Sequence, residues 1–242
     1  MGLLTDQSRL VVESTAIAFI KFNEFYSGIF LRSVTFPLIQ INYESYISTF
    51  MNAMSRGEKV QQSLISSICN LTEGLNHPDN RSCRLMQDPF PLLNKLTTLG
   101  FASRVNDIIY GSFMAVTGIL QTCSDPFLAI NYIEHLVLKY QEFMGSDDIS
   151  KTVRSSLLTA LHSSVLVLRD KNQPADDAVM DKVFAFVCYH FDTFREVDGD
   201  GLYVISGLAT TFEKKFGKHL DRSWGYIVHA LTKVRYPVNL GK

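Results

Sequence analysis

The stretch "GDGLYVISGLATTFEKKFGKHLDRSWGYIVHALTKV", Gly199 to Val234, indicates most clearly how this chain folds. It begins with an acidic residue among glycines, which suggests a metal-binding loop, and continues with lysines, which suggest a phosphate or nucleic-acid site. A third interpretation explains the stretch better: one helical hairpin of a repeat array. The rest of the chain supports this interpretation, because helical periodicity dominates it.

Apolar residues recur every three or four positions in several parts of the chain, which is the spacing of one helix face. No stretch of comparable length alternates with period two, so we expect an all-α fold. The apolar stripes are Val60, Leu64, Ile68, Leu71 and Leu75; Ile109, Phe113, Val116 and Leu120; Ile130, Ile133, Val137, Tyr140 and Met144; Val153, Leu157, Leu161, Val165 and Leu168; and Val179, Val183, Phe186, His190 and Phe194.

The predicted helices form alternating pairs of similar length. When the second helix of each pair is aligned by its first apolar turn, the starts fall at Val60, Ile109, Val153 and Gly201, which are 49, 44 and 48 residues apart. A two-helix unit of this size is typical of HEAT solenoids, in which neighbouring hairpins bury each other's apolar faces. We expect small residues where second helices approach closely: Ser63, Ser112, Ser156, Ser206 and Gly207. Residues 1–242 are therefore predicted to form one HEAT-repeat, armadillo-like α-solenoid of about five hairpins.

Composition excludes several classes of protein. The chain has 23 Lys and Arg against 24 Asp and Glu residues, so no global field attracts it to nucleic acid or an acidic membrane. The longest apolar run, residues 29–41, is too short to span a bilayer and contains Arg32 and Pro37, so we expect no membrane insertion. The cysteines form no CxxC pair, which favours free thiols in a reducing compartment: Cys69, Cys83, Cys123 and Cys188. We expect a soluble intracellular chain.

Motifs of catalysis and of metal binding are not found in the sequence. The "DGDG" segment from Asp198 fails as a calcium loop, because the fifth position is Leu202 and the twelfth is Ala209. We interpret Asp198 or Asp200 as a helix N-cap. The histidines show no zinc spacing, and His190 lies on an apolar stripe, where a satisfied core residue is expected. With no nucleophile elbow or facing carboxylate pair, we expect no enzyme activity, no cofactor and no metal.

The "EKKFGKH" cluster, Glu213 to His219, follows one predicted helix of the hairpin. Lysines near a helix C-terminus interact favourably with the exposed carbonyl groups, so we interpret the cluster as a solvated face. The alternative is contact with an acidic partner. A phosphate-binding loop is excluded, because the GxxxxGK(S/T) pattern is missing.

The opening stretch resembles a HEAT hairpin of the importin-β (karyopherin-β) family. Features of the family pattern are an acidic start, a leucine, an "(A/V)(I/V)S-x-L" core, an "F-x-K-(Y/H)-(M/L)" run and an aromatic-rich second segment. In this chain they correspond to Asp200, Leu202, "VISGL" from Val204, "FGKHL" from Phe216, and Trp224 with Tyr226. Upstream, "IIYGSFMAV" from Ile108 and "EKVQQSLISSICNLTEGL" from Glu58 are similar to preceding repeats of the family.

The resemblance covers residues 45–236, and residues 1–44 match a first repeat only loosely. The chain departs from the family in two places. It has Ser66 where family members carry a tryptophan on the groove side, and it has no counterpart of the family's acidic loop. Family members are several times longer, so the resemblance implies a fragment or a short paralogue that lacks the N-terminal repeats needed for the main Ran·GTP contact. It implies a function in the nuclear import of protein cargo. The expected location of the chain is the cytoplasm, the nucleus and the nuclear pore.

The resemblance further implies a groove, formed by the second helices, that binds protein cargo or an importin-α-like adaptor. FG nucleoporins and Ran·GTP are further partners that the resemblance implies. Polar residues at the starts of the second helices are the expected contacts, and binding should weaken with salt. The candidates are Glu58, Gln61, Gln62, Asp107, Asp147, Asp148, Asp198 and Asp200. The alternative is a HEAT scaffold that binds proteins independently of Ran and of nuclear pores.

Overall fold

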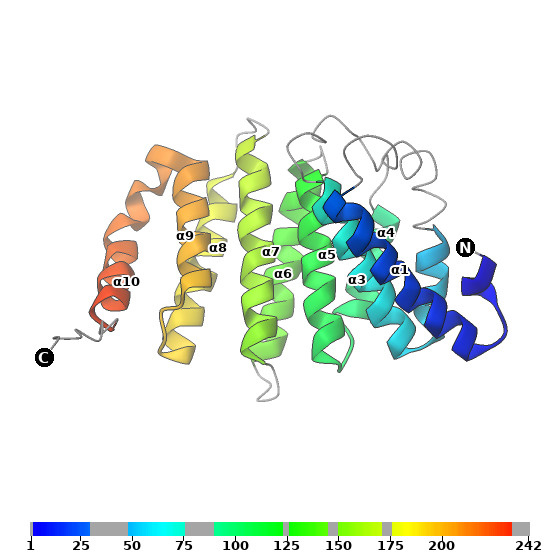
Figure 1. Cartoon of the computed structure of the whole chain (residues 1–242). Helices are drawn as coiled ribbons and strands as arrows, with labels where there is room; N and C mark the ends of the chain where they lie inside the picture. Colours follow the sequence, from blue (N-terminus) through cyan, green and yellow to red (C-terminus); the bar gives the residue numbers. More distant parts are fainter. Residues whose placement is uncertain are drawn as a thin grey trace, which may run out of the picture.

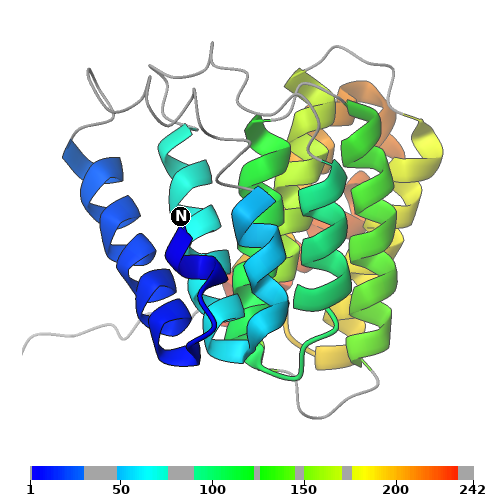
Figure 2. The ribbon, with the colours of Figure 1, turned by 90° about the vertical axis from the view of Figure 1, so that its right-hand side faces the viewer.

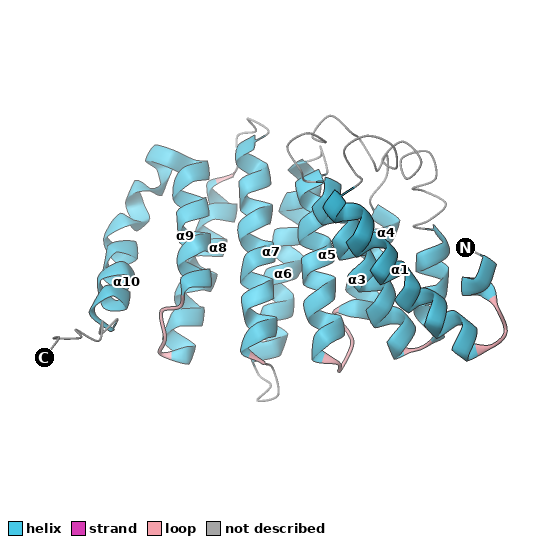
Figure 3. Cartoon of the chain, in the orientation of Figure 1, coloured by secondary structure: helices cyan, strands magenta, loops and turns pink. Residues whose placement is uncertain are grey.

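The fold was analysed in a computed structural model of the chain, which describes residues 2–29, 48–75, 90–122, 126–144, 150–170 and 176–233. Within these ranges all regular structure is helical and no strand occurs, as Figure 3 shows. The predicted all-α fold is therefore confirmed. The predicted contact residues Asp147 and Asp148 lie outside the described residues.

The described residues form nine α-helices, most of them long, together with short 3₁₀ and π-helical segments. The α-helices are α1 (Arg9–Ile29), α3 (Glu58–Leu75), α4 (Phe90–Lys95), α5 (Asn106–Thr122), α6 (Pro126–Met144), α7 (Lys151–Asp170), α8 (Asp177–Phe194), α9 (Gly199–Phe212) and α10 (Leu220–Lys233). A π-helical turn, η4 (Leu96–Gly100), continues α4. The 3₁₀ segments are η1 (Gly2–Thr5), η2 (Met54–Arg56) and η5 (Glu213–His219), and a helical segment at 48–53 leads into η2.

The helices are arranged in two rows. Helices α1, α3, α5, α7 and α9 pack successively, each against the next, and form the row at the front of Figure 1. Helix α6 packs against α7 and α8, and α8 packs against α9, so they form a second row behind the first, visible in the end-on view of Figure 2. Helix α10 lies at the C-terminal end of the array. We call α3, α5, α7 and α9 the second-helix row.

The predicted apolar stripes form the core between the rows. The stripe of α7, from Val153 to Leu168, is buried throughout, and so is the stripe of α5 from Ile109 to Leu120. In α8, Val183, Phe186 and His190 are buried as predicted. Each helix thus buries an apolar face against its neighbours, which provides the main stabilisation of such an array.

Small residues allow the second helices to pack closely. A Cβ atom added at Gly207 of α9 would lie 2.7 Å from Cδ2 of His162 in α7, and one added at Gly111 of α5 would lie 2.9 Å from Cγ2 of Ile65 in α3. Ser63, Ser112 and Ser156 are buried, and Ser112 lies against Gly100 of η4. The prediction for Ser206 is wrong: Ser206 is exposed. One residue turns a helix by about 100°, so Gly207 faces α7 and Ser206 faces solvent.

Candidate functional site

The predicted partner-binding residues lie at the N-terminal ends of the second-helix row. Glu58 is exposed at the start of α3, and Asp107 is exposed at the start of α5. Gln61 and Gln62 are half-buried, and the Nε2 atom of Gln62 donates to Oδ2 of Asp107 over 3.2 Å. The structure therefore brings Gln62 and Asp107 together across two neighbouring helices.

Asp198 has a structural position instead. Its Oδ1 atom accepts a hydrogen bond from the backbone N–H of Gly201 over 2.8 Å, which makes it the N-cap of α9, as predicted. Its Oδ2 atom lies 2.7 Å from Nε2 of His190. Both carboxylate oxygens are thus engaged within the chain, which disfavours the predicted role in partner binding. Asp200 is half-buried beside a cavity of about 10 Å³, which has room for no more than a single water.

His190 connects three helical elements through a buried network. Its ring is 1% exposed, its Nδ1 atom hydrogen-bonds with the Tyr140 hydroxyl of α6, and its Nε2 atom with Asp198 at the start of α9. A neutral imidazole satisfies both partners when Nε2 carries the hydrogen, because Nδ1 then accepts from the tyrosine. The prediction that His190 is a satisfied core residue is therefore confirmed. Burial also raises the pKa of Tyr140, which keeps the hydroxyl protonated.

The ionised form of Asp198 is stabilised in the fold. Burial alone would raise the pKa of Asp198, but the hydrogen bonds from His190 and from the Gly201 N–H, with the nearby charge of Lys151, lower it below its ordinary value. A carboxyl group with a lowered folded pKa stabilises the protein above its unfolded pKa, and this stabilisation is lost as the pH falls through the folded pKa.

Replacing Asp198 with asparagine tests this charge, since asparagine retains the N-cap. We expect Asp198→Asn to cost about 1.5–2 kcal/mol of unfolding free energy at neutral pH, because the imidazole loses a charged acceptor. The cost should shrink as the pH falls from about 4, the ordinary carboxyl pKa, through the lower folded pKa of Asp198, because the wild-type carboxyl is then protonated in the folded state as well. Urea unfolding at several pH values measures the loss of stability at neutral pH and its decrease at acidic pH. A cost that does not change between neutral and acidic pH would contradict the assignment.

The lysine cluster in η5 is exposed as predicted, but two of its lysines form ion pairs within the chain. Nζ of Lys215 lies 2.8 Å from Oδ1 of Asp177, and Nζ of Lys218 lies 2.8 Å from Oδ2 of Asp181. His219 adds a contact of 2.7 Å to Asp181. The hydrogen bonds from Lys218 and His219 lower the pKa of Asp181. These pairs join η5 to α8, so this cluster is no strong candidate for binding an acidic partner.

The outer face of the second-helix row has no formal charge along its length. Segments 60–72, 108–120, 155–168 and 201–212 contain no Asp, Glu, Lys or Arg. Tyr110 and Tyr203 are 40% and 65% exposed on this face, and Ser206 and Thr210 are also exposed. The ring of His162 lies 6.1 Å from that of Tyr203, and burial lowers the pKa of His162, which favours its neutral form. We call this surface the uncharged face.

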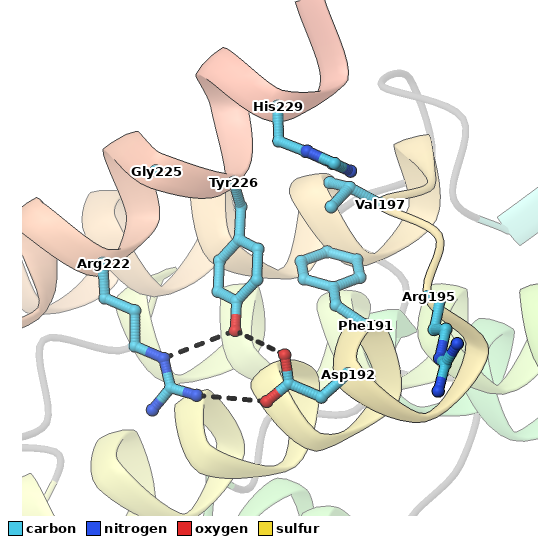
Figure 4. Close-up of a pocket in the computed structure, with 8 residues that line it drawn as sticks. All are labelled: Phe191, Asp192, Arg195, Val197, Arg222, Gly225, Tyr226 and His229. Atoms are coloured by element: carbon cyan, nitrogen blue, oxygen red, sulfur yellow. Dashed lines mark hydrogen bonds and ion pairs between the residues drawn. The ribbon is translucent and has the colours of Figure 1, made fainter. Parts of the chain in front are cut away.

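A cleft separates α10 from the end of α8 (Figure 4). Its volume is about 690 Å³, and it is lined by Phe191, Asp192, Arg195, Val197, Arg222, Gly225, Tyr226 and His229. On one side the Tyr226 hydroxyl donates to Oδ1 of Asp192 over 3.3 Å, and Arg222 donates to Oδ2 of the same carboxylate over 3.3 Å. Burial raises the pKa of Tyr226 to about 12, so the hydroxyl stays neutral.

Helix α10 presents its apolar side away from this cleft. Leu220, Trp224, Val228 and Leu231 follow one another at helical spacing and are between 42% and 67% exposed. At about 100° per residue they lie opposite the α10 residues that line the cleft. The sequence contains this stripe, but its direction depends on how α10 attaches to η5, which the sequence did not indicate.

Sequence reasoning also missed the uncharged face and the cleft. The sequence shows that the second helices carry no charge between their ends. Only the two-row packing shows that these four uncharged segments share a surface. The cleft joins residues of α8 to residues about thirty positions later in α10, and no local pattern connects them.

The described residues contain no group of three or more His, Cys, Asp or Glu side chains placed to hold a metal ion. None of the described helices combines the length and hydrophobicity needed to cross a bilayer. Cys188 is a buried thiol whose pKa is raised by burial, and Cys69 is half-buried, with its thiol donating to the Gly111 carbonyl over 3.2 Å. Comparisons of the chain with protein-family models, with curated proteins and with solved structures find no match.

Proposed function

We propose that this chain is a HEAT-type helical-repeat protein whose function is to bind other proteins through the uncharged face of its second-helix row. One observation carries the proposal: α3, α5, α7 and α9 have no charged residue between their ends, and Tyr110, Tyr203, Ser206 and Thr210 are exposed along this row. Surfaces of soluble domains ordinarily carry about 25–35% charged residues. Depletion of charge together with enrichment of tyrosine is typical of the core of a protein interface.

The arrangement of the row supports this function physically. Tyr110 of α5 and Tyr203 of α9 stand on opposite sides of α7, whose Thr159 and His162 are half-buried between them. Polar residues at the helix starts, among them Glu58 and Asp107, border the face at one edge. A partner would therefore contact uncharged side chains at the centre and charged ones at the rim, which is the usual anatomy of an interface.

The finer proposal is an importin-β-like nuclear transport receptor segment that binds cargo or an importin-α-like adaptor. It rests on the resemblance of residues 45–236 to that family. The alternative remains a scaffold that binds its partners independently of Ran. The two differ in one respect that can be measured, because only a transport receptor should release its partner to Ran·GTP.

The experiment is an affinity pull-down from cytosol with this chain as bait, with and without Ran locked to GTP. Tyr110→Glu and Tyr203→Glu place a charge on the uncharged face and should reduce recovery of the prey about tenfold or more. Tyr189→Glu on α8 is the matched control, because Tyr189 is 52% exposed outside this row. Prey released by Ran·GTP favours the transport receptor, and prey unaffected by Ran·GTP favours the scaffold. Prey retained equally by both face variants would refute the proposed surface.

A further inference from the structure

We infer that copies of this chain associate head to tail, with the apolar side of α10 in one copy bound to an exposed face of α1 in the next. Figure 1 shows these two helices at opposite ends of the array. The contact does not use the uncharged face, so this inference is independent of the function proposed there. The two surfaces are Leu220, Trp224, Val228 and Leu231, which we call the α10 stripe, and Leu10, Ser14, Ile17 and Ala18, which we call the α1 face.

Helices inside the array are covered on two sides by other helices of their row. Helix α3 lies between α1 and α5, α5 between α3 and α7, and α7 between α5 and α9. At the C-terminal end, α10 contacts α8 through Tyr226, whose ring centroid lies 4.8 Å from that of Phe191. The α10 stripe points away from this contact and is between 42% and 67% exposed. A second copy at the stripe would continue the stacking that the helices of one chain already show.

The α1 face is apolar and uneven. Leu10 and Ile17 are 75% and 51% exposed, and the small residues Ser14 and Ala18 beside them are exposed as well. At about 100° per residue all four lie on one side of α1. The space over Ser14, between the two large side chains, suits the ring of Trp224, because helices pack with the ridges of one in the grooves of the other.

Charge does not oppose this contact. Segments 14–20 and 223–232 contain no Asp, Glu, Lys or Arg. Glu13, which lies between Leu10 and Ile17 in the sequence, is paired with Arg9, whose Nε atom is 2.6 Å from Oε1 of Glu13. A head-to-tail contact covers both apolar surfaces at once, whereas a two-fold pairing of α10 with α10 would leave the α1 face in water.

The size of the α10 stripe indicates how strong the association is. Trp224 is 62% exposed, which leaves roughly 150 Å² of this residue open to solvent. With the three aliphatic residues the stripe exposes roughly 400 Å², which is within the range of the largest apolar patch on a monomer and is often functional. A stable interface buries about 800 Å² on each partner. We therefore expect reversible association that depends on concentration, and not a permanent oligomer.

Sedimentation velocity of the full chain tests the association. The average mass should rise above that of a monomer as the concentration increases from about 1 to about 100 µM, the range expected for a small interface. Added sodium chloride should not weaken the association, because the contact is apolar and not ionic. Trp224 is the only tryptophan in the sequence, so its emission should shift to shorter wavelength over the same range of concentration.

Two variants distinguish a head-to-tail contact from a two-fold contact. Trp224→Glu alters the α10 stripe and Ile17→Glu alters the α1 face, and each variant alone should associate at least tenfold more weakly than wild type. An equimolar mixture of the two should form a one-to-one complex and nothing larger, because each variant keeps one intact surface. Recovery of this complex also shows that both variants are folded.

Leu138→Glu is the matched control, because Leu138 is 54% exposed on α6, in the middle of the array, and its replacement should leave association unchanged. Tyr203→Glu, which alters the uncharged face, should also associate like wild type, so failure of this inference is distinguishable from failure of the proposed function. The inference is overturned if wild type stays monomeric at about 100 µM. It is equally overturned if either Trp224→Glu or Ile17→Glu alone associates like wild type, or if their mixture forms no complex.

Discussion

Replacing His190 with alanine should lower the free energy of unfolding by about 3–5 kcal/mol, the largest effect that we predict. His190 is 1% exposed and satisfies the Tyr140 hydroxyl on one side and the Asp198 carboxylate on the other. Its removal leaves a carboxylate that is only 18% exposed without its imidazole partner, and a buried hydroxyl without an acceptor. It also leaves a cavity where the ring packed against Phe194, at a centroid distance of 5.2 Å.

Urea unfolding followed by circular dichroism measures this loss. His135→Ala is the control, because His135 is exposed on α6 and its replacement should change stability by no more than about 0.5 kcal/mol. Since Asp198 also caps α9, amide exchange at the start of α9 should be faster in the His190 variant. A loss of stability below about 1 kcal/mol for His190→Ala would show that the network does not hold α6, α8 and α9 together.

Gly100→Ala should cost about 2–3 kcal/mol, the upper part of the range for overpacking. A Cβ atom added at Gly100 would lie 1.8 Å from Oγ and 2.6 Å from Cβ of Ser112. The Ser112 hydroxyl can rotate away, but its Cβ is fixed to the backbone of α5. The added methyl group therefore forces η4 and α5 apart, and the cost includes contacts along both helices.

A double-mutant cycle tests this contact directly. Ser112→Gly removes the opposing Cβ, so the combination with Gly100→Ala should be less destabilising than the sum of the two single changes. Gly217→Ala is the control, since no atom lies within 4 Å of its added Cβ, and it should shift stability by about 1 kcal/mol or less. Additive effects of Gly100→Ala and Ser112→Gly would indicate that the two residues are not in contact.

These predictions also indicate which residues are available for function. The buried network uses Asp198, just before the opening stretch, and the ion pairs of η5 use Lys215 and Lys218, so these charges are engaged within the chain. Among the described residues, the surfaces left for binding include the uncharged face, the cleft at α10 and the exposed apolar side of α10. Charge-complementary docking on the second helices would involve their starts, where Glu58 and Asp107 are exposed.

The sequence by itself determined the elements of this protein. The stripes at three- and four-residue spacing located the helices, and the Asp198 cap located the start of α9, because both signals depend on residues within a few positions of one another. The burial of His190 followed from its place on such a stripe.

Only the tertiary structure decided which faces the helices present to one another. Ser206 and Gly207 are neighbours in the sequence, yet one faces solvent and the other faces His162, because packing against α7 fixes the rotation of α9. The use of Asp198 by His190 and the cleft at α10 likewise join residues from separate helices. Helical periodicity is a local property of the chain, whereas the neighbour that covers each face depends on how the helices pack, which no local pattern specifies.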